Sequence, residues 1–142
     1  MNDKKARFIV EAAVIGAIYV VLTVIFAPIS FGEVQVRFAE ALTVLPFFTA
    51  SAVPGLFVGC LLANLLGGGV WFDVVLGSIA TLLGAIFTYR WREKPLLAAF
   101  SPVLFNGLIV GPVVYFAYVR APGDPVSIAT LLFNMATVAL GE

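Results

Sequence analysis

Apolar runs long enough to cross a lipid bilayer constrain this chain more than any other feature. The first, residues 8–27, has about the length that the hydrocarbon core demands, and further apolar runs follow it. Charged residues make up 11% of the sequence, whereas a soluble domain carries about 25%. The chain therefore lacks the polar atoms to cover a water-facing surface, and we predict an all-α integral membrane protein.

Six transmembrane helices are predicted, in one membrane domain that takes in residues 1–142. Their ranges are 8–27, 38–48, 54–66, 73–89, 96–119 and 127–142. Residues 29–38 alternate between polar and apolar side chains, which is the period of an extended segment. As a helix the last range reaches about 24 Å, short of a core of roughly 30 Å, so we expect the sequence to be truncated within the sixth helix.

Basic side chains orient these helices. They form two groups of three, before the first helix and after the fourth: Lys4, Lys5 and Arg7, then Arg90, Arg92 and Lys94. Both groups are expected in the cytoplasm, which places the N-terminus there and requires an even number of crossings between them. Four crossings put residues 29–38, 67–72 and 120–125 outside. A two-crossing topology stays open because the second and third helices are short, as does cleavage of the first run as a signal peptide, although its length favours a helix.

Polar side chains converge at the outer helix ends in the four-crossing topology. Glu40 lies in the first turn of the second helix, Asn64 in the last turn of the third, and Asp73 at the start of the fourth. Polar groups at membrane depth are functional candidates by default, so we predict a small outward-open pocket with apolar walls. Its candidate substrate-binding residues are Gln35, Arg37, Glu40, Asn64, Trp71, Asp73 and, at greater depth, Asn106.

Each candidate also has a structural interpretation. Asp73 would cap a helix after a glycine turn, and Glu40 would pair with Arg37 three residues before it. The asparagines would serve as hydrogen bonds between helices. Trp71 would belong to the aromatic belt at the membrane surface.

Small residues in the first helix predict a close helix–helix contact. Ala13 and Ala17 are four residues apart, as are Ala12 and Gly16, and such pairs let another backbone approach. The partner helix is either part of another subunit or part of this chain.

Several classes of function are excluded by missing residues. The sequence has no His and one Cys, so a disulfide framework is impossible and a His/Cys metal site is not expected. It also lacks the phosphate-binding motif G-x-x-x-x-G-K-[ST] and the hydrolase motifs G-x-S-x-G and H-E-x-x-H. We therefore expect no enzyme, no catalytic residues, no cofactor and no metal.

Four stretches of the chain resemble the QueT family. They are residues 31–48 (FGEVQVRFAEALTVLPFF), 54–67 (PGLFVGCLLANLLG), 73–84 (DVVLGSIATLLG) and 102–111 (PVLFNGLIVG). The resemblance implies a six-helix substrate-binding S component of an energy-coupling factor (ECF) transporter in the bacterial cytoplasmic membrane, which imports a queuosine precursor. It also implies partners: a transmembrane coupling subunit, which Ala13 and Ala17 would contact, and two ATPase subunits.

The implied substrate fits the predicted pocket. A 7-deazaguanine ring presents two neighbouring N–H donors, which a carboxylate accepts together, and Glu40 or Asp73 would supply it. Trp71 would stack on the ring, and Asn64, Asn106 or Arg37 would donate to its carbonyl oxygen. Two alternatives stay open: an S component for a different vitamin or purine-like base, and a structural membrane subunit without a small-molecule ligand.

Overall fold

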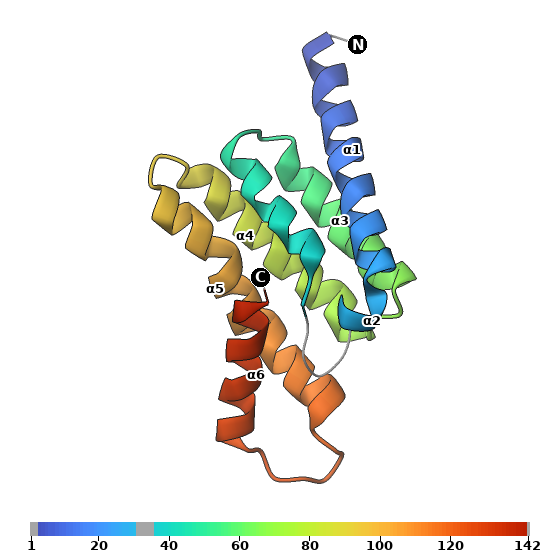
Figure 1. Ribbon diagram of the computed structural model, residues 1–142, viewed down its shortest axis with the longest axis vertical. Helices are drawn as coiled ribbons and strands as arrows, with labels where there is room; N and C mark the ends of the chain where they lie inside the picture. Colours follow the sequence, from blue (N-terminus) through green and yellow to red (C-terminus); the bar gives the residue numbers. More distant parts are fainter. Residues whose placement is uncertain (1–2, 31–35, 142) are drawn as a thin grey trace.

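The computed structural model describes residues 3–30 and 36–141 of the chain, and all of its regular elements are helices (Figure 1). The long helices are α1 (Asp3–Ile25), α3 (Ala52–Leu66), α4 (Ser78–Arg90), α5 (Pro95–Val114) and α6 (Ile128–Leu140). Shorter pieces are α2 (Ala27–Ser30), the 3₁₀ helix η1 (Phe38–Phe47), and two π-helical segments, η2 (Asp73–Gly77) and η3 (Tyr115–Val119). The segment η2 leads into α4, and η3 continues α5.

These helices agree closely with the six predicted from the sequence. Two differences stand out. The second helix is a 3₁₀ helix, which rises about 2.0 Å per residue instead of 1.5 Å and so spans more of the bundle with ten residues. Residues 29 and 30 are helical, contrary to the prediction of an extended segment, and the rest of the alternating segment lies largely outside the described residues.

Within the described residues, three helical stretches are long and apolar enough to cross a membrane. They are Asp3–Ile25, Asp73–Arg90 and Pro95–Val119. The other three predicted spans correspond to shorter apolar helices of 10–17 residues.

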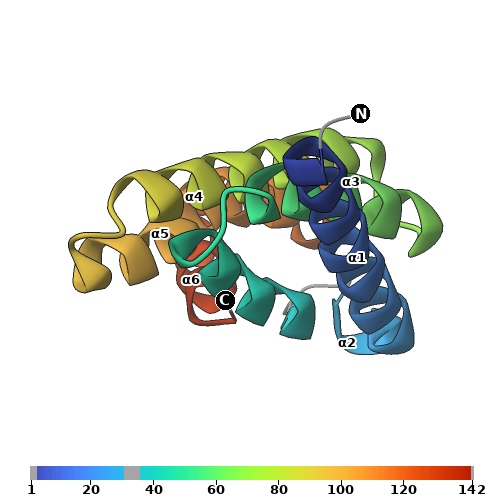
Figure 2. The same cartoon turned by 90° about the horizontal axis from the view of Figure 1, so that it is seen from above.

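Neighbouring helices pack through glycines. A Cβ on Gly55 of α3 would lie 2.6 Å from the carbonyl oxygen of Ala12 in α1, and one on Gly59 would lie 2.9 Å from that of Gly16. At the α5–α6 contact, a Cβ on Gly111 would lie 2.6 Å from Met135 Cα. These backbones approach so closely because the crossing points carry no side chain, as is common in membrane proteins. Figure 2 shows α4 between α3 and α5, with α1 on one side of the bundle and α6 on the other.

Apolar and polar side chains are distributed as a lipid environment requires. Large apolar residues such as Ile25, Leu66 and Leu96 are 65–76% exposed, whereas Arg37, Glu40 and Asp73 are at most 4% exposed. Exposed large apolar side chains suit a lipid surface, and charged side chains are almost never fully buried unless they are paired.

The N-terminus of α1, the 48–51 connection and the 91–94 turn all lie toward the upper part of Figure 1, which we term the basic end. It carries both groups of basic residues that were used to orient the chain. At the other end of the bundle, Arg37 immediately precedes η1 and Asp73 begins η2. We term this the polar end.

Candidate functional site

A buried ion pair links η1 to the start of η2 at the polar end. The Nη2 atom of Arg37 lies 3.0 Å from both Oδ1 and Oδ2 of Asp73, and the two side chains are 3% and 0% exposed. Arg37 thus pairs with a carboxylate 36 residues away. The sequence had left open a local pair between Arg37 and Glu40, but the carboxylate that pairs with Arg37 here belongs to Asp73.

Two further residues of the polar end surround this pair. Asn64 Nδ2 donates a hydrogen bond to the backbone carbonyl of Asp73 at 3.3 Å, which joins the end of α3 to η2. A Cβ on Gly77 would lie 3.2 Å from Asp73 Oδ1, 3.3 Å from Asn64 Nδ2 and 3.6 Å from Arg37 Nη1. The three polar side chains can converge here because position 77 has no side chain.

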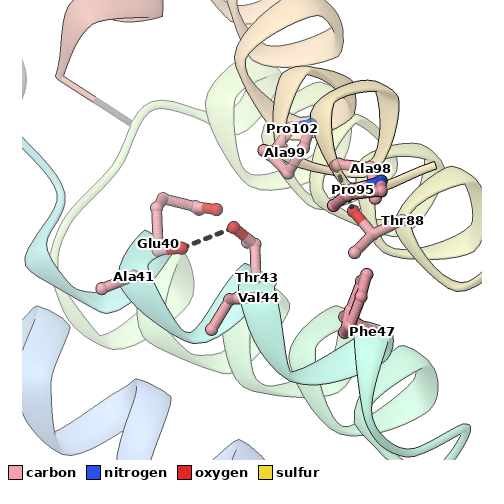
Figure 3. Close-up of a pocket in the computed structure, with 10 residues that line it drawn as sticks. All are labelled: Glu40, Ala41, Thr43, Val44, Phe47, Thr88, Pro95, Ala98, Ala99 and Pro102. Atoms are coloured by element: carbon pink, nitrogen blue, oxygen red, sulfur yellow. Dashed lines mark hydrogen bonds between the residues drawn. The ribbon is translucent and has the colours of Figure 1, made fainter. Parts of the chain in front are cut away.

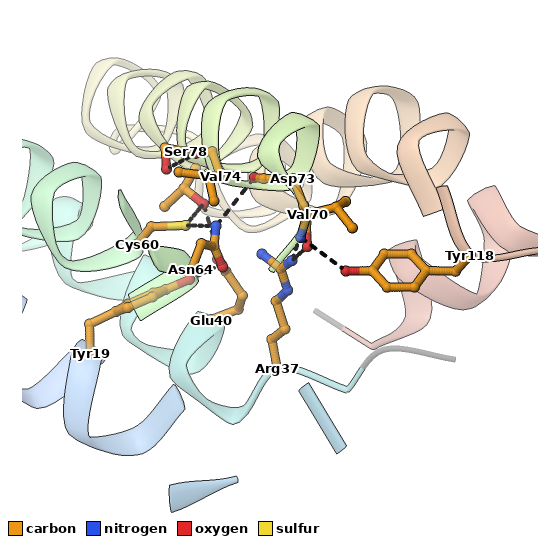
Figure 4. Close-up of polar contacts among 11 residues, drawn as sticks. Tyr19, Arg37, Glu40, Cys60, Asn64, Val70, Asp73, Val74, Ser78 and Tyr118 are labelled. Atoms are coloured by element: carbon orange, nitrogen blue, oxygen red, sulfur yellow. Dashed lines mark hydrogen bonds and ion pairs between the residues drawn. The ribbon is translucent and has the colours of Figure 1, made fainter. Parts of the chain in front are cut away.

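The loop before Asp73 is held by the end of the fifth helix. Tyr118 in η3 accepts a hydrogen bond from the backbone N–H of Val70 at 3.4 Å, and the N–H of Asp73 in turn donates to Val70 O at 2.9 Å. Figure 4 shows Tyr118 and Arg37 reaching this loop from different elements. The position of Asp73 therefore depends on η1, α3 and η3 together.

A second carboxylate, Glu40, lies one helical turn further into the bundle. Its Oε1 accepts hydrogen bonds from the hydroxyl of Tyr19 in α1 and from Thr81 Oγ1 in α4, the latter at 3.3 Å. Thr81 Oγ1 also lies 3.4 Å from Cys60 Sγ, and Asn64 Nδ2 lies 3.5 Å from the same sulfur. Polar contacts thus run without a break from Glu40 to Asp73 across four elements.

Three members of this network were missed in the sequence: Tyr19, Cys60 and Thr81. All three lie within apolar runs, where a single hydroxyl or thiol does not stand out. One available signal was the spacing of Cys60 and Asn64, which are four residues apart and so share a face of α3.

Glu40 is also one of the residues that line a cavity (Figure 3). Among the described residues none donates a hydrogen bond to Glu40 Oε2, although the side chain is fully buried. The cavity measures about 360 Å³ and is lined from η1, the end of α4 and the start of α5. In Figure 3 the carboxylate points toward Ala99 and Pro102 on α5.

The cavity extends from Glu40 toward the basic end, because Phe47, Thr88 and Pro95 also line it. The sequence had predicted a pocket open at the polar end, where the ion pair of Arg37 with Asp73 now lies. The walls are mainly apolar, with Thr43 and Thr88 as the other side chains that carry hydroxyl groups.

The other predicted site residues are placed as follows. Asn106 is fully buried in α5. Trp71 is 70% exposed beside η2, so its ring lies on the outer surface of the bundle. Gln35 lies outside the described residues.

The two small-residue pairs of α1 differ in how far they are exposed. Gly16 is buried against α3, where a Cβ would lie 3.0 Å from Gly55 O, so this pair serves a contact within the chain. Ala13 and Ala17 are exposed. They border an apolar groove between α1 and α3 that Pro54, Val58 and Leu62 line from the other side.

The fold and the site together define a helical membrane protein that buries charged groups inside its bundle, as transporters do. The family model described as "QueT transporter" matches residues 9–142. The chain therefore belongs to the QueT transporter family, as its sequence motifs indicated. This is a family of transporters and not of enzymes.

One curated relative is the queuosine precursor transporter QueT of Lactococcus lactis subsp. cremoris (strain MG1363), which is 33% identical over 99 residues. Those residues make up 66% of this chain and 58% of the relative, so the chain spans less than two thirds of that protein's length. No solved structure matches the chain.

Proposed function

We propose that this chain is the substrate-binding membrane subunit of an ECF-type importer and that it binds a queuosine precursor of the 7-deazaguanine type. The observation that carries the proposal is the buried Glu40 oxygen Oε2, which accepts no hydrogen bond from the described residues and belongs to a side chain at the edge of the cavity. Membership of the QueT family and the printed function of the Lactococcus relative support the substrate class.

Glu40 selects for a ligand that brings hydrogen-bond donors. A carboxylate has about four acceptor positions, and the hydroxyls of Tyr19 and Thr81 occupy two of them on Oε1. Oε2 keeps room for two donors, and a buried acceptor left without a donor costs about 1–3 kcal/mol, more when it is charged. The neighbouring N–H groups of a 7-deazaguanine ring, or a cationic aminomethyl substituent, supply such donors.

Asp73 has a different role in this proposal. Both of its oxygens lie 3.0 Å from Arg37 Nη2, so the ion pair already engages each of them. We assign Glu40 to the direct ligand contact, and we assign Asp73, Arg37 and Asn64 to closing the polar end of the site. Asn106, Gln35 and Trp71 remain proposed ligand contacts.

The proposed topology has six crossings, with the N-terminus and the 91–94 turn in the cytoplasm of a bacterial cell. It is supported by the basic residues gathered at one end of the bundle (Figure 1). The polar end then faces outward. The exposed pair Ala13 and Ala17 is the proposed contact for the coupling subunit, because small residues allow a partner helix to approach closely. Two ATPase subunits would supply the energy.

The experiment is a calorimetric titration of the purified protein with 7-aminomethyl-7-deazaguanine. We expect Glu40→Gln to weaken binding by about 10- to 100-fold, since a hydrogen bond to a charged group contributes about 1.5–3 kcal/mol. The matched control is Glu93→Gln, which removes an exposed carboxylate from the 91–94 turn, and its affinity should equal that of the wild type. Unchanged affinity of Glu40→Gln would remove Glu40 from the site.

A second titration tests the substrate class. An analogue without the 2-amino group lacks one of the two neighbouring donors, and we expect about tenfold weaker binding. If a different purine-like base raises the unfolding temperature of the protein and deazaguanines do not, the substrate assignment is wrong, because a ligand that binds only the folded state must stabilise it.

A further inference from the structure

Tyr19 connects the first helix to the proposed ligand carboxylate. Its hydroxyl donates a hydrogen bond to Glu40 Oε1, and the residue is 1% exposed. Its ring packs in a buried cluster with Ala39, Leu56 and Cys60. In Figure 4 the ring reaches from α1 toward Glu40. A tyrosine hydroxyl buried in this way fixes which oxygen of Glu40 remains available to a ligand.

The place of Tyr19 depends on how α1 sits on α3. One turn before it, Gly16 crosses α3 so closely that a Cβ would lie 3.0 Å from Gly55 O. A Cβ on Gly59 would likewise lie 3.0 Å from Tyr19 Cβ. Such a crossing has no compressible side chains between the two backbones. Any change in the separation of the two helices must therefore shift Tyr19 relative to Glu40.

The same helix also presents a surface to its surroundings. Ala13 and Ala17 are exposed on α1, within one turn of the buried Gly16. Nearer the N-terminus, α1 is attached to the 48–51 connection by Glu11, whose Oε2 accepts a hydrogen bond from Ser51 Oγ at 2.9 Å. Over its whole length α1 contacts α3 most, and it contacts η1, which carries Glu40, to a smaller extent.

We propose that α1 sets the ligand affinity of the site through Tyr19, which acts as a positioning residue for Glu40. When α1 is seated on α3, the Tyr19 hydroxyl holds Oε1 and leaves Oε2 as the oxygen that can accept from a ligand. Displacement of α1 withdraws the hydroxyl, frees the carboxylate to turn, and lowers the affinity for a donor-bearing ligand. The inference rests on the proposed function for the ligand and for the coupling subunit that engages the Ala13 and Ala17 face.

The test is a double-mutant cycle on ligand affinity in the full chain. Tyr19→Phe keeps the ring and removes the hydroxyl, and we expect about tenfold weaker binding of 7-aminomethyl-7-deazaguanine. Gly16→Ala forces α1 away from α3 by a few tenths of an ångström, and we expect it to weaken binding several-fold. In the Tyr19→Phe background, Gly16→Ala should have almost no further effect, because the link that transmits the displacement is absent.

The matched control places the same strain on another pair of helices. A Cβ on Gly107 would lie 3.0 Å from Ala139 Cβ at the α5–α6 contact. Whatever Gly107→Ala does to affinity, its effect should add to that of Tyr19→Phe, because the two act through separate contacts. A merely structural role of Tyr19 would make both cycles additive.

Two results overturn the inference. One is an affinity of Tyr19→Phe equal to that of the wild type, and the other is an effect of Gly16→Ala that is equal in both backgrounds. Failure of the proposed function is distinguishable, since in that case the wild-type protein itself binds no deazaguanine.

Discussion

The ion pair between Arg37 and Asp73 predicts a specific pattern of stability. Arg37→Met removes the counter-charge of the buried Asp73 carboxylate, and Asp73→Asn removes the carboxylate that pairs with the buried Arg37 guanidinium. The two side chains are only 3% and 0% exposed, so water cannot replace the lost partner. Each single substitution should therefore destabilise the protein severely, whereas the double substitution removes both charges.

The magnitude follows from this burial. Removing one partner of a buried pair costs about 3–5 kcal/mol, which for a chain of this size corresponds to a fall of roughly 10–15 °C in the unfolding temperature. The double variant retains one neutral amide in place of a charge. It should recover most of the loss, to within about 1–2 kcal/mol of the wild type.

The assay is thermal unfolding of the detergent-purified protein, followed by its tryptophan fluorescence. The exposed pair of Arg7 with Glu11 provides the control, since its side chains are 83% and 36% exposed and its nitrogen–oxygen distance of 2.8 Å is no longer than that of the buried pair. Arg7→Met should cost less than about 1 kcal/mol. If the losses of Arg37→Met and Asp73→Asn simply add in the double variant, the two groups do not form the pair on which the closed polar end depends.

Three further predictions concern the cavity, the helix crossing and the topology. In the ligand-free protein, Glu40→Gln should raise the unfolding temperature by a few degrees, because it removes a buried charge at a site that sacrifices stability for binding; an unchanged or lower temperature would contradict this. Gly55→Ala should destabilise the protein by about 1–3 kcal/mol, since its Cβ would lie 2.6 Å from a backbone oxygen of α1 that cannot yield; a stability equal to the wild type would show that α1 is not seated on α3 in this way. In cells, Lys94→Cys should resist a membrane-impermeant maleimide while Asp124→Cys reacts, and the reverse pattern would invert the proposed orientation.

The helices could be predicted from the sequence because their signals are local. Long apolar runs, the prolines at 28 and 95 and the glycines at 67–69 set the helix ends to within a few residues. The conformation of the second helix was harder to predict. A short apolar segment with Pro46 inside it carries no signal that separates a 3₁₀ helix from an α-helix, and the packing of neighbouring helices decides between them.

For the candidate site, the sequence could indicate which polar residues lie at helix ends but not which groups pair with one another. Arg37, Asn64 and Asp73 stand out in the sequence as polar residues at helix ends, and in the structure they lie together. The partners of each group are determined by contacts between residues far apart in the chain. For that reason the sequence could not show that Arg37 pairs with Asp73 rather than Glu40, or that Tyr19 reaches Glu40 across 21 residues.

The central claim is that Glu40 Oε2 receives the hydrogen-bond donors of a bound deazaguanine. A structure of the protein with 7-aminomethyl-7-deazaguanine tests it directly. We expect nitrogen atoms of the ligand within about 2.7–3.2 Å of Glu40 Oε2, with the Tyr19 hydroxyl still on Oε1. A ligand bound elsewhere, with this oxygen still lacking a donor, would contradict the account.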